Sequence, residues 1–194
     1  MSLGLIEYYF LGINIFGFIL AIISTLLYCY TANGQIDIIL TIVATIGGSL
    51  GIVLEFLLID RLLAKCVMLS RVYAVCMGVI QLIIFLWLEG FHAQEINFAI
   101  VDFFEKNKIL LMYLLVINGV AFLLYGLDKW LAIEHKSRIR IVTLLLVALL
   151  GGSIGALIAM YVFRHKTRKI YFTIGVPLIL IMQIIVIFYA MNFA

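Results

Sequence analysis

Charged residues are scarce in this sequence. They occupy 12% of its 194 positions, against 66% for hydrophobic residues. A soluble domain of this length cannot bury so much apolar surface, because part of the surface of a small domain always stays in water. The composition therefore excludes a soluble fold. It also excludes a soluble basic domain that binds nucleic acid, so no nucleic-acid partner is expected.

Cysteines and catalytic motifs are few as well. Cys29, Cys66 and Cys76 show neither CxxC nor metal-ligand spacing, so the sequence indicates no disulfide framework and no zinc site. It has no nucleophile elbow and no paired-carboxylate motif. Its first residues, MSLGLIEYYFLG, lack the basic region of a cleavable signal. We expect no metal and no cofactor, and an enzyme is the less favoured class.

Long apolar runs are what the sequence has instead, and they predict an all-α integral membrane protein in contact with the lipid bilayer. Six such segments cover residues 8–30, 38–59, 72–88, 109–127, 141–163 and 170–193.

The two halves of the chain match when the sequence is shifted by 104 positions, with no gap. GGSLG at Gly47 to Gly51 then meets GGSIG at Gly151 to Gly155, and Asn14 meets Asn118. Such a match predicts a tandem repeat of two three-segment units. The expected divisions are a first repeat at 1–90, a polar or amphipathic linker at 91–107 and a second repeat at 108–194. The paired asparagines are expected to form hydrogen bonds across helices.

The glycine clusters leave two architectures open. If all six segments span, the Lys and Arg residues divide 7 to 6 between the two membrane faces, although short loops usually carry a strong bias. If the second and fifth segments instead turn back at their glycines, the division is 11 to 2. The alternatives are six spanning helices, or four spanning helices and two re-entrant hairpins. The hairpin or packing glycines are Gly47, Gly48, Gly51, Gly151, Gly152 and Gly155.

The second half carries ordered motifs that resemble a known family. They are Asp128-Lys129, Arg138-Ile139, Gly151-Gly152-Ser153-x-Gly155 and His165-Lys166-Thr167-x-Lys169. Together they resemble the bacterial membrane family called domain of unknown function 1294. Members usually carry a glutamate where this chain has Ile141. The resemblance implies a multipass protein of the bacterial cytoplasmic membrane and implies no activity.

Basic side chains near helix ends form the main candidate site. Such side chains bind phosphate, arginine in a bidentate manner and lysine as a point charge. The alternative is that they only set the membrane topology. His165 and Asp128 are the catalytic candidates. Asp128-Lys129 is alternatively a salt-bridged anchor or the counter-ion of a bound substrate. The candidate ligand-binding residues are Lys129, Arg138, Arg140, His165, Lys166 and Lys169.

One further acid, Glu55, lies inside an apolar segment. An ionisable group at that depth is a candidate proton or cation carrier. The alternative is that its side chain extends toward Arg61 or Lys65.

Three functions remain open at this point. The first is a small transporter or flippase-like protein that binds an anionic, phosphate-bearing lipid or solute, such as an anionic phospholipid or a lipid-linked phosphate. The second is a non-catalytic accessory subunit with a membrane-protein partner, or a homo-oligomer. The third is a membrane enzyme that modifies lipid headgroups.

Overall fold

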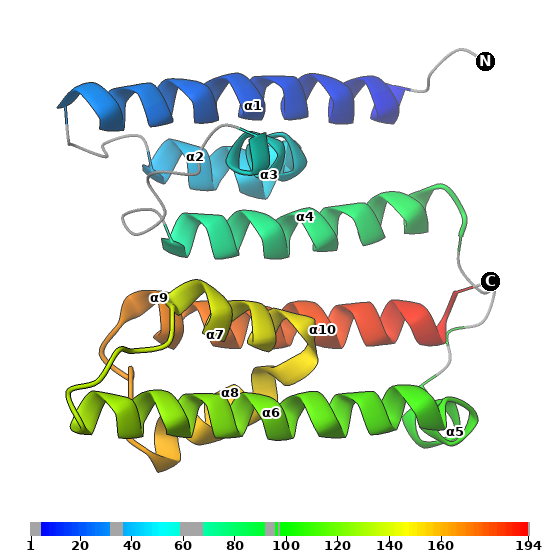
Figure 1. Ribbon diagram of the computed structural model, residues 1–194. Helices are drawn as coiled ribbons and strands as arrows, with labels where there is room; N and C mark the ends of the chain where they lie inside the picture. Colours follow the sequence, from blue (N-terminus) through cyan, green and yellow to red (C-terminus); the bar gives the residue numbers. More distant parts are fainter. Residues whose placement is uncertain (1–4, 32–36, 59–67, 92–95, 97, 194) are drawn as a thin grey trace. The chain divides into compact units, whose positions relative to one another are not determined.

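A computed structural model describes residues 5–31, 37–58, 68–91, 96 and 98–193. Every regular element in these ranges is a helix (Figure 1). The chain divides into two compact units, Met1–Glu89 and Gly90–Ala194. Within the described residues, six helices are long and apolar enough to cross a membrane. The expectation of an all-helical membrane protein is therefore confirmed.

The first unit consists of a long helix, a bent pair of short helices and a second long helix. Its elements are α1 (Leu5–Thr31), α2 (Asp37–Val43), the π-helical turn η1 (Ala44–Gly48), α3 (Ser49–Leu58) and α4 (Met68–Leu88).

The second unit has the same order of elements, with a short helix added before the first long helix and another before the last. Its elements are α5 (Ile100–Lys106), α6 (Lys108–Ile133), α7 (Ile141–Val147), the π-helical turn η2 (Ala148–Gly152), α8 (Ser153–Val162), α9 (Ile170–Thr173) and α10 (Gly175–Met191).

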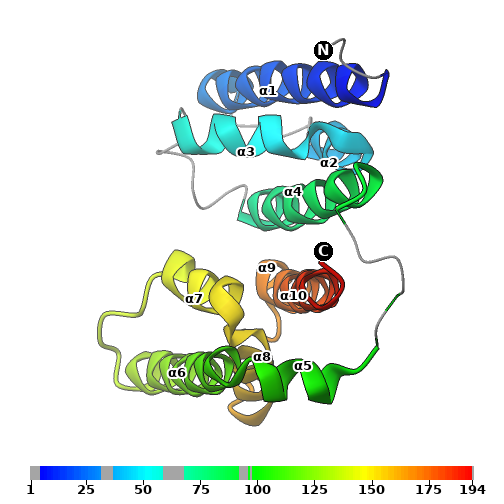
Figure 2. The same ribbon diagram turned by 90° about the vertical axis from the view of Figure 1, so that its right-hand side faces the viewer.

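A sharp bend interrupts the middle segment of each unit. Figure 1 shows α3 nearly end-on while α2 lies along α1, and Figure 2, turned by 90°, shows α3 lengthwise. The bends occur at Gly47, with φ 140°, and at Gly151, with φ 121°. Side chains strongly disfavour this backbone region, and glycine adopts it freely. The glycine clusters therefore mark the positions where the two apolar segments change direction.

A second pair of glycines allows the helices to cross closely after each bend. A Cβ placed on Gly51 would lie 1.9 Å from the carbonyl oxygen of Asn14, and one on Gly155 would lie 2.0 Å from that of Asn118. At the same crossings, the Gly51 N–H donates to Asn14 Oδ1 at 2.9 Å and the Gly155 N–H donates to Asn118 Oδ1 at 2.7 Å. The predicted hydrogen bonds of the asparagines across helices are confirmed.

At each bend, a glutamine of the last long helix of the unit also binds backbone carbonyl groups. In the second unit, Gln183 Nε2 donates to the carbonyls of Ala148 and Leu149 at 2.7 and 3.0 Å. In the first unit, Gln81 Nε2 donates to the carbonyls of Ala44 and Thr45. Buried backbone groups need such partners, above all in a lipid environment.

These glutamines show that a constant shift of 104 does not hold throughout the chain. Gln81 and Gln183 occupy matching places 102 positions apart. The expectation of a match without a gap was wrong for the third segment. It rested on the first two segments, where glycine and asparagine give a clear register, whereas the third segment has no comparable pattern.

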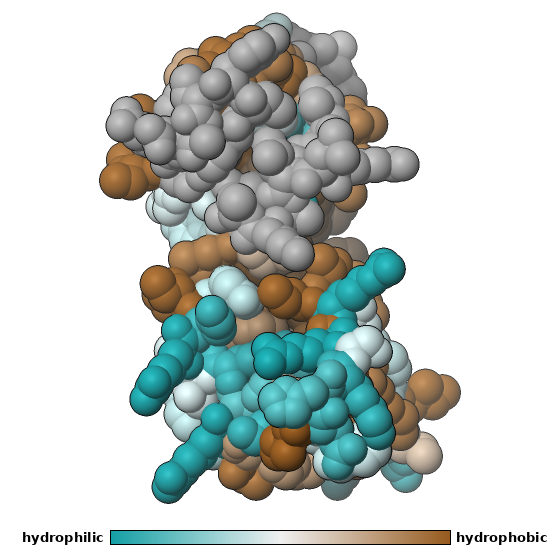
Figure 3. All heavy atoms as spheres, turned by 60° about the vertical axis from the view of Figure 1, so that its left-hand side comes forward, coloured by the Kyte–Doolittle hydropathy of each residue, from teal (hydrophilic) through white to brown (hydrophobic). Residues whose placement is uncertain are grey.

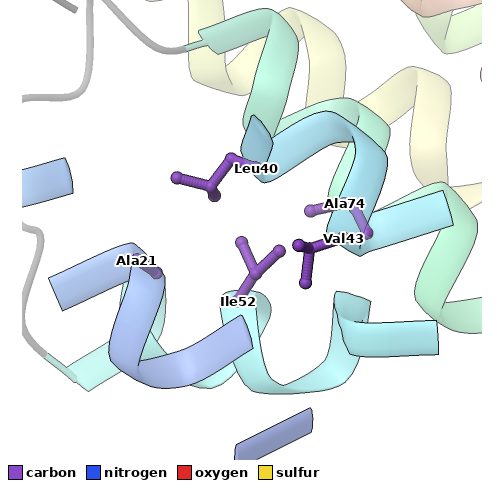
Figure 4. Close-up of a cluster of buried hydrophobic side chains, with 6 residues drawn as sticks. Ala21, Leu40, Val43, Ile52 and Ala74 are labelled. Carbon is purple, nitrogen blue, oxygen red and sulfur yellow. The ribbon is translucent and has the colours of Figure 1, made fainter. Parts of the chain in front are cut away.

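The core of the first unit lies where the two arms of the bent segment face α1 and α4. Ala21, Leu40, Val43, Ile52 and Ala74 are buried together there (Figure 4). Small residues on α1 and α4 leave room for the branched side chains of α2 and α3, so all the helices of this unit share one apolar core.

We expect Gly155→Ala to destabilise the protein, because its Cβ would overlap the Asn118 backbone and push α8 away from α6. Overpacking of this kind typically costs about 1–3 kcal/mol. The matched control is Gly119→Ala on α6, where an added Cβ meets nothing within 4 Å. Unfolding of both variants in detergent measures the difference, and equal stabilities would contradict the close crossing.

Candidate functional site: a buried carboxylate that joins both ends of the bent segment

Asp128 lies near the C-terminal end of α6, and its side chain is 0% exposed. Its Oδ1 accepts a hydrogen bond from the Ile139 backbone N–H at 2.9 Å. Its Oδ2 lies 2.7 Å from both His165 Nε2 and Lys166 Nζ. A buried carboxylate is tolerated only with this kind of compensation, by charge and by hydrogen bonds.

The partners of Asp128 come from opposite ends of the same apolar segment. Ile139 precedes α7, whereas His165 and Lys166 follow α8. Both ends of the segment Ile141–Val162 therefore lie beside the same residue of α6, as Figure 1 also shows for the start of α7 and the connection between α8 and α9. We call Asp128, Ile139, His165 and Lys166 the neck, together with Phe172, whose ring Lys166 contacts.

Contacts along α6 trace the path of the segment between its two ends. The Tyr125 hydroxyl donates to the Leu144 carbonyl at 3.4 Å, and the Tyr113 hydroxyl donates to the Leu150 carbonyl at 2.6 Å, next to the bend. On the return, the Phe163 ring packs against the Phe122 ring with centroids 5.2 Å apart. The segment therefore runs along α6 from Asp128 to Tyr113, about 22 Å of helix, and back again.

Lys166 has two partners. Its side chain is 13% exposed, and Nζ lies 2.7 Å from Asp128 Oδ2 and 4.6 Å from the centre of the Phe172 ring. Burial lowers the pKa of Lys166 below its ordinary value of 10.5, Asp128 opposes this shift, and Arg138 adds to it. Among the described residues, the lysine that pairs with Asp128 is Lys166. The predicted salt bridge between Asp128 and Lys129 was therefore wrong. Sequence adjacency suggested Lys129, but the fold brings Lys166 back from beyond α8.

The other predicted ligand residues surround the neck. Arg138, Arg140 and Lys169 are exposed, and Lys129 is half-buried. Figure 3 shows hydrophilic side chains gathered over this end of the second unit. Glu134 is also exposed there and pairs with Lys136 at 3.4 Å. We call the exposed Lys and Arg residues of this end the basic surface: Lys136, Arg138, Arg140, Arg164, Arg168 and Lys169.

Glu55 belongs to the first unit and is 0% exposed. The Thr25 hydroxyl donates to its Oε1 at 2.8 Å. Its suggested partners Arg61 and Lys65 lie outside the described residues. The structure thus places this acid between α3 and α1 and not at the neck.

Sequence reasoning missed several contributors to the neck. The Ile139 N–H and the Phe172 ring carry no motif signal, because a backbone donor and a core aromatic residue look like many others. His165 and Asp128 were considered together, and the structure brings them to 2.7 Å. Both oxygens of Asp128 already accept from the protein, which suits a structural anchor. In the described part of the chain, no three His, Cys, Asp or Glu side chains gather as a metal-binding group.

These helices and this neck define a multipass integral membrane protein. The model of a protein family of unknown function, DUF1294, matches residues 118–172, from Asn118 of the helix crossing to Phe172 of the neck. An uncharacterised Bacillus subtilis protein, YsdA, is 42% identical over 79 residues, which are 41% of this chain and 89% of the relative. The chain therefore belongs to the DUF1294 family, as its motifs suggested.

The relative is much shorter than this chain and comparable in length to a single unit. No solved structure matches the chain.

We expect Asp128→Asn to destabilise the protein by about 3 kcal/mol at neutral pH, because it leaves the Lys166 ammonium buried without its counter-charge. Without Asp128 the pKa of Lys166 falls further below 10.5, the value of the unfolded chain. The unfolded state then binds more protons than the folded state between these two pKa values, so stability rises with pH in that window. Unfolding measured from about pH 7 to pH 10 should show the loss shrinking.

The control for this experiment is the double variant Asp128→Asn, Lys166→Met, which lacks the titrating amine. Its own stability should therefore show no pH dependence from residue 166. A loss in Asp128→Asn that is the same at every pH would mean that the ion pair does not hold the neck.

Proposed function

We propose that the bent segments of both units are re-entrant hairpins, which enter and leave the membrane on the same face. The neck supports this topology, because Asp128 contacts both ends of one segment. The bends support it as well, since irregular backbone inside a bilayer must be bound by protein groups, as Asn118 and Gln183 do here. The basic surface then faces the cytoplasm, in keeping with the usual excess of Lys and Arg on that side, which for a bacterial protein is the inner face of the cytoplasmic membrane.

We further propose that the two units descend from one duplicated ancestor. Support comes from bonds that recur within each unit. The Tyr9 and Tyr113 hydroxyls donate to Ile46 and Leu150, and the Asn14 and Asn118 side chains accept from Gly51 and Gly155. The length of the Bacillus subtilis relative, close to that of a single unit, agrees with this origin.

The function that the geometry supports best is a small transporter or flippase-like protein that binds an anionic, phosphate-bearing lipid on its cytoplasmic face. The basic surface is the observation that carries this proposal. Six exposed Lys and Arg residues surround the neck, and Glu134 opposes them. Each Lys or Arg near an anionic membrane surface contributes about 1 kcal/mol of attraction, and arginine also binds phosphate through two parallel hydrogen bonds. Hairpins that end inside the membrane are common at transport sites.

A headgroup-modifying enzyme is the second candidate, and the His165–Asp128 distance of 2.7 Å is the observation that favours it. In this reading Asp128 orients His165, which acts as the general base or acid. The full occupation of both Asp128 oxygens fits a positioning role for this carboxylate.

Trp130 offers a direct test of lipid binding, because it is 52% exposed and Lys136 Nζ lies 5.1 Å from the centre of its ring. In a Trp87→Phe protein in bilayers, lipids brominated on their acyl chains quench this tryptophan. We expect brominated phosphatidylglycerol to compete at least about five-fold better than brominated phosphatidylcholine, the ratio that about 1 kcal/mol corresponds to. Arg138→Gln with Arg140→Gln should bring the ratio close to one.

The matched control is Lys106→Gln with Lys108→Gln, which removes two positive charges at the other end of α6 and should leave the ratio unchanged. A ratio of one in the parent protein would count against lipid binding and favour the accessory-subunit alternative. If lipid binding survives and His165→Ala abolishes a lipid-modifying turnover, the enzyme reading takes precedence.

Cysteine labelling tests the topology. In a protein without Cys29, Cys66 and Cys76, we expect Lys136→Cys and Arg168→Cys to resist an impermeant thiol reagent in intact cells, because both lie on the neck side. Glu105→Cys, at the other end of α6, should react. If Arg168→Cys reacts and Lys136→Cys does not, the segment crosses the membrane and the hairpin proposal fails. Lys166 is unsuitable for this purpose, because it is buried against Asp128.

A further inference from the structure

The end of α6 that lies far from the neck borders an open groove of about 780 Å³. Residues 105–110 and Tyr113 line it, where α5 ends and α6 begins. This volume lies within the usual range of small-ligand sites, about 300–1,000 Å³. None of the residues that line the groove belongs to the neck or to the basic surface.

The bent segment reaches this groove only with its tip. Tyr113 lines the groove, and its hydroxyl donates to the Leu150 carbonyl beside the Gly151 bend. Because the segment turns back at that point, α6 extends beyond it by more than one helical turn, to Lys108. In the proposed topology, the groove therefore lies beside the part of α6 that the hairpin does not cover.

The walls of the groove combine positive charge with apolar surface. Lys106 and Lys108 are exposed, and Glu105 is the acid that accompanies them. Beside these charges, Ile109 is 87% exposed, and Leu110 continues the apolar wall. Ammonium groups next to an exposed apolar wall match a phosphate headgroup attached to an acyl chain.

Helix α5, which precedes the groove, indicates where the groove lies in the bilayer. On α5, Ile100 and Val101 are exposed together with Asp102 and Glu105. A short helix with exposed apolar residues and charges is typical of the membrane interface. Lys106 ends this helix and Lys108 begins α6, so in the proposed topology both lie at headgroup level on the face opposite the neck.

We propose that this groove binds an anionic phospholipid of the opposite leaflet, with its phosphate at Lys106 and Lys108 and an acyl chain along Ile109 and Leu110. The inference rests on the proposed hairpin topology and adds a second lipid site to the proposed one. A protein that moves a phosphate-bearing lipid between leaflets needs a site on each face, and the two sites then lie at the two ends of α6.

Quenching by brominated lipids tests this site separately from the neck. The reporter is Ile109→Trp in a full-length protein that also carries Trp87→Phe and Trp130→Phe. The brominated lipid is exchanged into the leaflet on the groove side. We expect brominated phosphatidylglycerol to compete about five-fold better than brominated phosphatidylcholine. The ratio should fall close to one with Lys106→Gln and Lys108→Gln and stay unchanged with Arg138→Gln and Arg140→Gln.

Three results would overturn the proposal: equal quenching by the two lipids, a preference that survives removal of both lysines, or a preference that inorganic phosphate abolishes, which would assign the groove to a soluble anion. If the Ile109→Trp reporter shows no lipid preference and Trp130 does, the groove is not a lipid site and the basic surface at the neck remains one. The reverse pattern would leave the groove as the lipid site and remove the cytoplasmic one.

Discussion

The architecture of the second unit depends on the buried charge of Asp128. A carboxylate without solvent is costly, so its oxygens need several donors at once. Here the donors are a backbone N–H before the bent segment and two side chains after it. Satisfying this one group therefore fixes both ends of a 22-residue apolar segment at one level of α6. The family motif acquires a physical meaning from this arrangement, since its Asp, Arg-Ile and His-Lys elements meet at the neck.

The middle of the segment obeys a second constraint, because the polar backbone groups at the bend need hydrogen-bond partners. Gly151 supplies the backbone angle, and Asn118 and Gln183 supply the hydrogen bonds. The first unit meets the same need with Gly47, Asn14 and Gln81. Polar side chains that bind irregular backbone hold the bend in one shape, which suits a rigid support better than a binding site.

The two units use their buried acids differently. In the second unit the carboxylate lies on the long helix α6, and the matching position of α1 is Ser24. In the first unit the carboxylate is Glu55 on the returning arm, and Thr25 of α1 donates to it. This difference agrees with different roles for the two units, since the second unit carries the basic surface around the neck.

The sequence by itself determined the membrane class, the helical fold and the places where the chain bends. These follow from composition, from runs of apolar residues and from glycine, whose backbone freedom is a local property. It also marked Asn14 and Asn118 as cross-helix donors and acceptors. Only the tertiary structure decided that Asp128 pairs with Lys166 and not with Lys129, that Gln81 and Gln183 break the constant register, and that Phe172 and the Ile139 N–H complete the neck. Each of these depends on how far the chain returns through space, and spacing along the sequence carries no measure of that distance.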